Sequence, residues 1–324
     1  MVRPEEVPVV RRVCALLTEI AEQMTTPTGM QGLPLSPDLM AEIEPKLAAR
    51  RAQLGKDCIS ELSFSNFHLF REAHQYRYVS GAWPHIIGRT YDGAHHVTPL
   101  FDPTTAPVEV LTELLTGCDC LYPLAAAEVA TLDPQRFALT SMRDDSDYLY
   151  ASQVFRDYTG VELRKKRQAV AQLQTTHALS CEPLSMATRD VAAHILQDWM
   201  RDKNKQSGEA DEAACAEALA NAEFFGLEGW LFRADGEPAG FVLAQPLAPR
   251  TVAMRFAKGL DAYPGIYPHM FQSCCRHWGN SVQWLNFEQD LGNSNFRRTK
   301  LSFHPEVLLE KFRVSLRPTQ HKAA

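Results

Sequence analysis

The chain has 324 residues, of which 45% are hydrophobic and 22% charged, with 17 glycines and 20 prolines. This composition is typical of a globular protein and excludes a disordered or collagen-like chain. One hydrophobic core rarely fills a chain of more than about 250–300 residues, so we expect two domains. No apolar run approaches the roughly 18 residues that span a bilayer, and the first residues lack the apolar core of a signal peptide. We therefore expect no transmembrane segment and a cytoplasmic protein.

The net charge of −6 is unevenly distributed along the chain. Residues 1–150 contain 12 Lys and Arg against 20 Asp and Glu, a balance of −8, whereas residues 151–324 contain 21 against 19, a balance of +2. From Arg250 onward the counts are 11 and 5, a balance of +6. A basic region beside an acidic one suits a polyanionic partner bound at one place, but solvated charge without a partner gives the same pattern.

Eight cysteines are spread over the chain without a signal peptide, so we expect thiols rather than disulfides. Cys118 and Cys120 are two residues apart, and Cys274 and Cys275 are adjacent. Neither pair has the C-x2-C spacing of a structural zinc site, so we expect no bound metal.

The first half of the chain predicts an N-terminal helix followed by a mixed α/β region. Apolar residues at helical spacing predict an amphipathic helix over residues 8–24, with too few Lys and Arg for a membrane-surface role, so we expect it to dock on the protein itself. A linker over residues 25–34 follows, and the Ser-Pro pair at 36–37 begins a helix that runs to about residue 54. Beyond it, the patterns predict strands at 76–80, 85–91, 95–100 and 136–140, and helices at 64–71, 107–115 and 125–132.

A second region begins after residues 147–150, with helices predicted over 161–175 and 188–203 and a polar loop after the second. The remaining predicted elements are strands at 229–233, 239–245 and 251–257, a helix at 266–278, a strand at 281–287, a short helix after Gly292-Asn293, and a strand at 307–314. Asp235-Gly236 predicts a tight turn between the first two of these strands. This order of elements resembles the second half of an acyl-CoA N-acyltransferase (GNAT) core.

Particular residues extend this resemblance to one family. Residues 286–292 (NFEQDLG), residues 297–305 (RRTKLSFHP) and Lys311 resemble the closing segment of the phosphatidylglycerol lysyltransferase C-terminal domain family. Shorter stretches resemble other parts of the same family, over about residues 36–314 in all: 59–66, 147–150, 165–167, 257–258 and 265–267.

The resemblance implies an α/β fold, with mixed sheets, of two tandem GNAT-like domains. We expect an N-terminal helical extension and linker over 1–35, a first domain over 36–150, and a second domain over 151–324 that carries the active site. The resemblance further implies that the second domain takes an aminoacyl group from a charged tRNA, while the acceptor enters the cleft between the domains. Members of known activity esterify a lipid head group.

The sequence leaves three hypotheses for the function of the protein. The leading hypothesis is an aminoacyl-tRNA-dependent transferase with a small-molecule, lipid head-group or peptide acceptor and no cofactor other than its donor substrate. An acetyl-CoA N-acyltransferase is the alternative enzyme, but the loop before residue 266 is a poor pyrophosphate cradle, because its two glycines are six residues apart and Asp261 lies between them. A non-catalytic module that binds an anionic ligand is the third hypothesis.

Two groups of cations are candidates for contacts with tRNA phosphates, which such a donor requires. The first group opens the helix predicted at 161–175, and Arg298 belongs to the second group, together with Arg297 and Lys300. A solvated helix face is an equal alternative for the first group and a weaker one for the second, whose cations follow Glu288 and Asp290 in the sequence. The candidates of the first group are Arg164, Lys165, Lys166 and Arg167.

Asn286, Glu288 and Asp290 alternate along the predicted strand, so we expect them to share one face. This face is either the active site or an internal network with Arg297 and Lys300. For catalysis, Asp290 could hold the ammonium of the donor, while Lys300 or Arg297 stabilises charge that develops at the ester carbonyl or the leaving oxygen.

Further candidates are less specific. Tyr148 and Tyr150 alternate on an apparent strand and suit either acceptor binding or core packing. Lys258 and Tyr267 lie in the stretches that carry the resemblance, which implies that they bind substrate. A lone histidine is more often structural than catalytic, but four are possible bases: His95, His96, His269 and His277.

Overall fold

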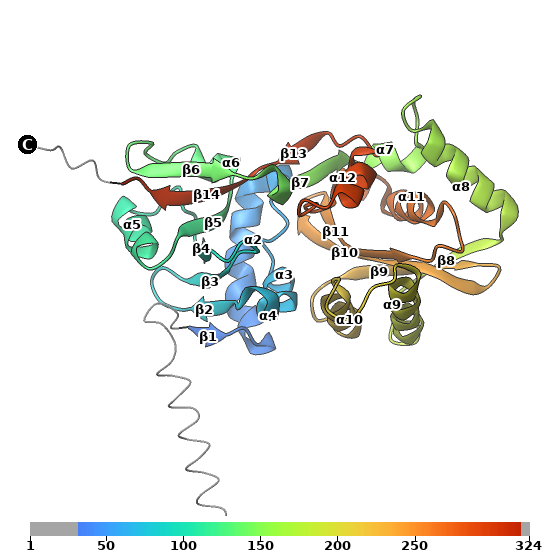
Figure 1. The fold of residues 1–324 in the computed structure, drawn as a ribbon, viewed down its shortest axis with the longest axis horizontal. Helices are drawn as coiled ribbons and strands as arrows, with labels where there is room; N and C mark the ends of the chain where they lie inside the picture. Colours follow the sequence, from blue (N-terminus) through green and yellow to red (C-terminus); the bar gives the residue numbers. More distant parts are fainter. Residues whose placement is uncertain (1–31, 319–324) are drawn as a thin grey trace, which may run out of the picture.

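The computed structural model describes residues 32–318 and contains two seven-stranded sheets that lie side by side along the long axis of the molecule (Figure 1). The strand order is β1-β2-β3-β4-β5-β14-β6 in the first sheet and β13-β7-β12-β11-β10-β9-β8 in the second. In each sheet one pair of neighbours is parallel, β4 with β5 and β11 with β12, and the other pairs are antiparallel. The predicted mixed α/β fold is confirmed.

The strands of the first sheet are β1 (Leu33–Pro34), β2 (Arg77–Val79), β3 (His85–Arg89), β4 (His95–Pro99), β5 (Cys120–Ala125), β6 (Phe137–Ser141) and β14 (Lys311–Leu316). Those of the second are β7 (Asp147–Ala151), β8 (Leu179–Pro183), β9 (Glu228–Ala234), β10 (Glu237–Ala248), β11 (Thr251–Gly259), β12 (Trp284–Asn286) and β13 (Val307–Leu309).

The α-helices are α2 (Met40–Leu54), α3 (Phe64–Leu69), α4 (Arg71–His74), α5 (Val108–Thr116), α6 (Ala126–Val129), α7 (Ser152–Asp157), α8 (Arg164–Thr176), α9 (Arg189–Asp202), α10 (Glu212–Ala220), α11 (Ile266–Trp278) and α12 (Ser294–Leu301). Short 3-10 turns are η1 (Pro37–Leu39), η2 (Gly55–Asp57), η3 (Arg143–Asp145) and η4 (Gly279–Ser281). None of the helices between residues 32 and 318 combines the length and apolar character needed to traverse a bilayer.

Most predicted elements are confirmed. The β9–β10 hairpin turns at Asp235 and Gly236, whose positive φ angles of 54° and 84° are those that a tight hairpin turn requires. The patterns gave no prediction for β5, β8 or α10. The predicted helix over 8–24 lies outside the described residues.

Two predicted strands differ from the structure. The strand predicted over 281–287 is present only as β12, which ends at Asn286. The strand predicted over 307–314 is divided into β13 and β14, which belong to different sheets.

The division into residues 36–150 and 151–324 stays a prediction, and strand pairing crosses it at two places. β7 lies before residue 151 along most of its length but pairs with β12 and β13 in the second sheet. β14 lies near the end of the chain but is inserted between β5 and β6 in the first sheet. Each sheet therefore needs a strand from the other half of the chain.

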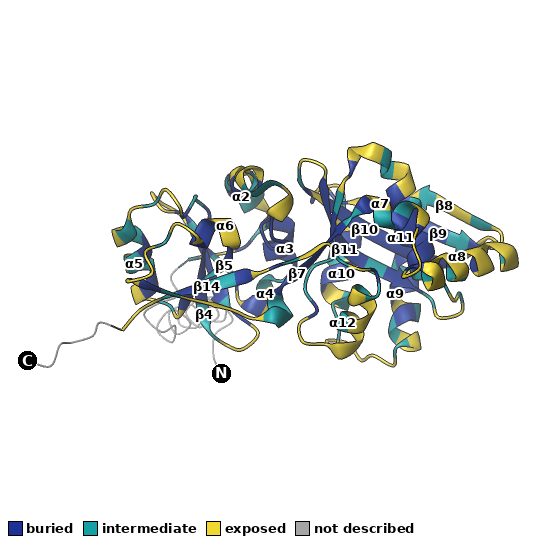
Figure 2. Ribbon diagram, turned by 90° about the horizontal axis from the view of Figure 1, so that it is seen from above, coloured by how far each residue is buried: buried dark blue, intermediate teal, exposed yellow. Residues whose placement is uncertain are grey.

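The apolar core has three parts. The largest joins α2 and α3 to the face of the second sheet that α9 and α10 cover, so the helices of the first half are packed onto the second domain. A second part lies under α8 and α11 on the opposite face of that sheet, and a third lies under α5 on the first sheet. Figure 2 shows the buried residues concentrated along the two sheets and in α3, which lies between them.

Lys311, the first residue of β14, is fully buried and carries two buried ion pairs. Its Nζ atom lies 2.6 Å from Oδ1 of Asp147 and 2.5 Å from Oε1 of Glu61. We expect Lys311→Met to lower the free energy of unfolding by about 3–5 kcal/mol, because both carboxylates would be left without their partner. Urea unfolding measures this loss.

Lys56→Met is the control, because Lys56 and Asp57 form an exposed pair for which we expect a loss within about 1 kcal/mol. A loss for Lys311→Met as small as that of the control would contradict a structural role for the buried lysine.

Candidate functional site

The segments that carry the family resemblance meet between the two sheets. They contribute to a polar network, here called the inter-sheet network. It combines residues from the turn before α3, from β7, from β11, from the end of β12 and the chain after it, from α12 and from the start of β14. Its members are Ser60, Glu61, Ser63, Asp147, Arg255, Asn286, Glu288, Gln289, Lys300 and Lys311.

Asp147 and Lys311 form the centre of this network, and both are fully buried. Oδ2 of Asp147 accepts from the Ser60 backbone N–H (2.7 Å) and from Nδ2 of Asn286 (2.9 Å), and Oδ1 accepts from the Ser60 hydroxyl (2.9 Å). Nζ of Lys311 also donates to Oε1 of Gln289 at 2.9 Å. A buried charge is tolerated when it is paired and its remaining hydrogen-bonding capacity is used, as it is here.

Arg255 reaches the network through a bulge in β11. The register of β10 and β11 shifts between Leu243–Phe256 and Ala244–Met254, which leaves Arg255 without a counterpart on β10. Such bulges redirect a side chain out of the regular alternation. Arg255 is buried, and its guanidinium donates to Oε1 of Glu288 at 2.5 Å. Its other donors bind Oε1 of Gln245, Oδ1 of Asn66, the Ser60 carbonyl and the Ser63 hydroxyl.

The predicted alternation of Asn286, Glu288 and Asp290 along one strand is wrong. Oδ1 of Asn286 accepts from the backbone N–H of Glu288 at 2.7 Å, a local bond that competes with strand pairing. Glu288 has a φ of +56°, a strained conformation that persists only where the surroundings fix it.

Lys300 supplies this constraint, because its Nζ donates to the carbonyls of Phe287 (2.6 Å), Glu288 (3.1 Å) and Gln289 (2.5 Å). Its three N–H donors are thus used by backbone carbonyls. Burial lowers the pKa of Lys300 to about 8.

Asp290 is fully buried and has no open acceptor position. Its carboxylate accepts from Nη1 of Arg143 (2.6 Å), from Nε and Nη2 of Arg297 (2.9 and 2.8 Å), from the Gly292 backbone (2.9 Å) and from the Tyr148 hydroxyl. Although burial by itself raises the pKa of a carboxyl, hydrogen bonds from Arg297 and Tyr148 hold the pKa of Asp290 well below its usual range. The structure thus brings Asp290 and Arg297 together, while Lys300 binds the backbone beside them.

The pKa values of two glutamates of the network are shifted upward, opposite to that of Asp290. Burial raises the pKa of Glu61 to about 7 even though Lys311 opposes this shift. Burial also raises the pKa of Glu288, opposed by Arg255. Raised carboxyl pKa values beside paired charges are common at functional sites. Glu288 therefore stays a candidate, as the sequence predicted, and Glu61 becomes one that the sequence patterns did not single out.

The remaining predicted binding residues lie in two places. Tyr148 and Tyr150 are fully buried, and the hydroxyl of Tyr150 donates to the Lys300 carbonyl at 2.8 Å. Lys258 has other partners: its Nζ donates to Oδ1 of Asp211 at 2.6 Å and lies 4.0 Å from the ring centre of Trp199. The Trp199 ring N–H in turn donates to the Tyr267 hydroxyl at 2.9 Å.

The four cations at the start of α8 differ in their surroundings. Arg164 and Lys165 are exposed, and neither has an ion pair or a side-chain hydrogen bond with another residue of the 32–318 range. Lys166 is half-buried with Nζ 3.9 Å from the ring centre of Phe303, and Arg167 donates to backbone carbonyls at Tyr158 and Gly160.

Arg298, on α12, is exposed and donates to Oδ1 of Asn295 at 3.1 Å. Arg164, Lys165 and Arg298 are therefore the predicted cations that are most available to a polyanion.

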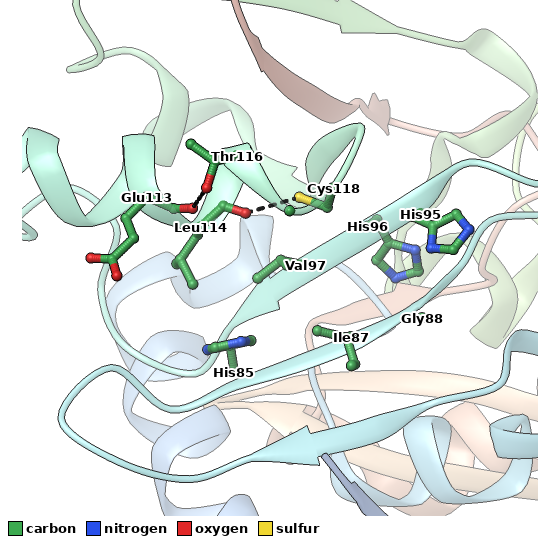
Figure 3. Close-up of a pocket in the computed structure, with 11 residues that line it drawn as sticks. His85, Ile87, Gly88, His95, His96, Val97, Glu113, Leu114, Thr116 and Cys118 are labelled. Carbon is green, nitrogen blue, oxygen red and sulfur yellow. Dashed lines mark hydrogen bonds between the residues drawn. The ribbon is translucent and has the colours of Figure 1, made fainter. Parts of the chain in front are cut away.

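A separate pocket of about 290 Å³ lies on the first sheet beside α5 (Figure 3). His85, His95, Glu113 and Cys118 contribute polar groups to its wall, and Ile87, Val97 and Leu114 contribute apolar ones. His96 also lines it, and burial lowers the pKa of this histidine to about 3. Among the described residues, no group of three or more His, Cys, Asp or Glu side chains is arranged to hold a metal ion.

Comparisons with known proteins agree with this architecture. Residues 53–315 match the family model described as "Phosphatidylglycerol lysyltransferase, C-terminal". No curated protein sequence matches the chain.

Solved structures show the same fold. A conserved protein of unknown function from Bacteroides thetaiotaomicron is similar with a TM-score of 0.75 and 20% identity, over 89% of this chain and 100% of that one. The C-terminal domain (DUF2156) described as that of a lysylphosphatidylglycerol synthetase from Agrobacterium fabrum has a TM-score of 0.61 and 12% identity, over 88% and 93% of the two chains. FemX has a TM-score of 0.57 and 8% identity, over 89% and 98%.

These identities are low, so the structural matches show the fold alone, which is that of tandem GNAT-like domains. The family model covers most of the described residues and includes all ten members of the inter-sheet network. The chain therefore belongs to the family of phosphatidylglycerol lysyltransferase C-terminal domains.

Proposed function

We propose that the protein is an aminoacyltransferase that moves an aminoacyl group from aminoacyl-tRNA to a hydroxyl or amine acceptor held between the two domains. The family supports a transferase, because its description names a lysyltransferase. The observation that carries the proposal is the convergence of the family-like segments on the inter-sheet network.

The network lies where a ligand is expected in a sheet of this type. β11 and β12 are parallel and pair only over Thr251–Ala253 and Trp284–Asn286, after which the chain leaves β12. Ligands of open α/β sheets usually bind beyond the carboxyl ends of parallel strands. Arg255 and Glu288 lie at this end and link the two strands across the opening.

The loop before α11 supports a donor other than coenzyme A. A Cβ atom on Gly259 would lie 2.7 Å from Cγ2 of Ile266, and one on Gly265 would lie 2.6 Å from the Ala169 carbonyl oxygen. Gly265 also has a φ of +96°. Packing and backbone conformation therefore account for both glycines without a phosphate ligand.

An aminoacyl ester is already activated, so the reaction needs no covalent enzyme intermediate. The acceptor oxygen or nitrogen attacks the ester carbonyl carbon, the bond from that carbon to the ribose oxygen breaks, and the acceptor proton ends on the ribose hydroxyl. The protein would contribute orientation and charge stabilisation. Because the contacts of Asp290, Arg297 and Lys300 are used internally, these residues are best suited to hold the chain around Glu288 in place.

A binding assay with aminoacyl-tRNA beside acetyl-CoA tests the donor. We expect saturable binding of aminoacyl-tRNA that weakens steeply with salt, and no binding of acetyl-CoA. The reverse pattern would replace the proposal by an acetyl-CoA N-acyltransferase, and binding of neither donor would leave a non-catalytic module.

Removal of the two exposed cations of α8 tests the tRNA surface. We expect Arg164→Ala combined with Lys165→Ala to reduce the slope of log affinity against log salt by roughly one to two units, because each lost phosphate contact removes about one unit. The control is Arg201→Ala on α9, which covers the other face of the second sheet. An unchanged slope in the double variant would assign Arg164 and Lys165 to a solvated helix face.

Asp290→Asn and Lys300→Met separate a catalytic from a positioning role. The contacts favour positioning, so we expect activity per folded molecule to be largely kept. Asp290→Asn should lower the free energy of unfolding by about 3–5 kcal/mol, because it breaks buried ion pairs. Lys300→Met should lower it by about 1–3 kcal/mol, because backbone carbonyls lose their donor. Asp133→Asn, in an exposed pair with Arg136, is the stability control. A stable variant whose turnover falls about 10²–10³-fold would instead make the residue catalytic.

A further inference from the structure

Two carboxylates of the inter-sheet network each have an oxygen that the network does not fully use. Oε1 of Glu288 accepts from Arg255, but Oε2 accepts no hydrogen bond from any residue between 32 and 318. Oε1 of Glu61 accepts from Lys311, and Oε2 has only a 3.4 Å contact with the Ser60 hydroxyl. The side chains keep 24% and 11% of their surface exposed, so a small ligand can reach them.

The contacts around these glutamates place them close together. Nη1 of Arg255 donates to Glu288, and Nη2 donates to the Ser60 carbonyl at 2.8 Å. Ser60 is the residue before Glu61. Lys311 holds Glu61 and also Gln289, the residue after Glu288. Each cation therefore binds one of the two glutamates and the chain neighbour of the other, which places the two glutamates in the same region of the network.

The cations of the network have no donor left for an anionic ligand. All three nitrogens of the Arg255 guanidinium are hydrogen-bonded. The ammonium of Lys311 lies within hydrogen-bond distance of four side-chain oxygens, and that of Lys300 binds three backbone carbonyls. What the network offers to a ligand is acceptor atoms, which select a donor of hydrogen bonds and, because they belong to carboxylates, a positively charged one.

The first domain adds two tyrosines to this place. Tyr76 is 93% buried (7% exposed), and its hydroxyl has no hydrogen-bond partner among the described residues. The pKa of Tyr76 is raised, first by burial and then by the negative charge of Glu61.

Tyr91 is 63% exposed. The His74 ring contacts both tyrosines, with its centre 5.0 Å from that of Tyr76 and 4.5 Å from that of Tyr91. The pKa of Tyr91 is also raised, first by burial and then by the negative charges of Glu61 and Glu288, while Lys311 opposes the shift. The Tyr76 ring packs against Phe67 of α3, with ring centres 5.0 Å apart, and Glu61 lies in the turn that precedes this helix. The two tyrosines, which share His74 as a neighbour, thus lie near that turn.

We propose that Glu61, Glu288, Tyr76 and Tyr91 form a binding site for a primary ammonium group, and, resting on the proposed function, that its occupant is the amino group of the aminoacyl donor. An ammonium has three N–H donors, which match the three open acceptors, Oε2 of Glu61, Oε2 of Glu288 and the hydroxyl of Tyr76. The Tyr91 ring adds a cation–π contact. This site takes the role that the sequence assigned to Asp290, whose oxygens are fully used.

Small amides test the site independently of tRNA. NMR titration of the whole protein compares L-alaninamide, which carries the ammonium, with N-acetyl-L-alaninamide, which lacks it. We expect the acetylated amide to bind about tenfold more weakly or worse, because hydrogen bonds to charged groups typically contribute a factor of ten or more. Equal binding of the two amides would overturn the proposal.

Glu288→Gln removes the charge but keeps the shape, so we expect L-alaninamide to bind about tenfold more weakly. Glu182→Gln is the matched control, since Glu182 pairs with Arg233 at 3.0 Å elsewhere in the second domain, and it should bind as the parent does. If Glu288→Gln fails to fold, Tyr91→Ala decides, because this exposed ring can be removed without opening the core; unchanged binding in Tyr91→Ala would then overturn the site.

Donor turnover identifies the source of the ammonium. We expect alanyl-tRNA to react faster than N-acetylalanyl-tRNA in the parent protein and this difference to disappear in Glu288→Gln. If both donors react equally while L-alaninamide competes with an amine acceptor, the site is kept but its occupant is the acceptor, which overturns the donor assignment. If no donor reacts although the ammonium-bearing amide binds selectively, the proposed function fails and the ammonium site stands.

Discussion

The buried ammonium of Lys311 is the interaction on which the joint between the two domains depends. Lys311 belongs to the first sheet through its pairing with Ala125, whereas Asp147 belongs to the second sheet and Glu61 to the turn before α3. One charge therefore satisfies carboxylates from two other parts of the fold. Because a carboxylate is costly to leave unpaired in a protein interior, each partner fixes the position of the others.

The same constraint determines what the network can offer to a ligand. The buried cations are surrounded by acceptors until no donor remains, and the strained backbone at Glu288 is kept in place by Lys300. A bulge at Arg255 then brings a guanidinium to the end of two parallel strands. Stability and recognition are thus linked, because the bonds that neutralise Arg255 and Lys311 also orient the open oxygens of Glu288 and Glu61.

Much of the fold could be predicted from local patterns, because amphipathic helices such as α9 and hairpins such as β9–β10 have short-range signals. β5 was missed because its run contains Pro123 and lacks alternation, and the extent of β12 was wrong because the amide of Asn286 binds the backbone two residues on. The sheet to which β14 belongs could not be predicted, because a local sequence pattern does not determine which strands pair with each other.

The candidate site was predicted in part for the same reason. The family-like segments located the region and included Glu61, Asp147 and Lys311, but spacing alone could not show which carboxylates were already saturated. Asp290 and Glu288 are both carboxylates in the same segment of the sequence. In the structure, the Asp290 carboxylate accepts five hydrogen bonds, whereas that of Glu288 accepts one, from Arg255. Arg255 had no sequence signal, because a bulge is visible only once two strands are paired.

The late position of β14 also affects how the molecule is made. The ribosome delivers β5 and β6 long before residues 311–316, so the nascent first sheet has an empty place between these two strands during most of translation. Open strand edges attract other chains, and early domains usually fold as they emerge. Here the first sheet can close only when the second domain has been synthesised, which makes completion of the whole polypeptide a condition for either half to reach its final form.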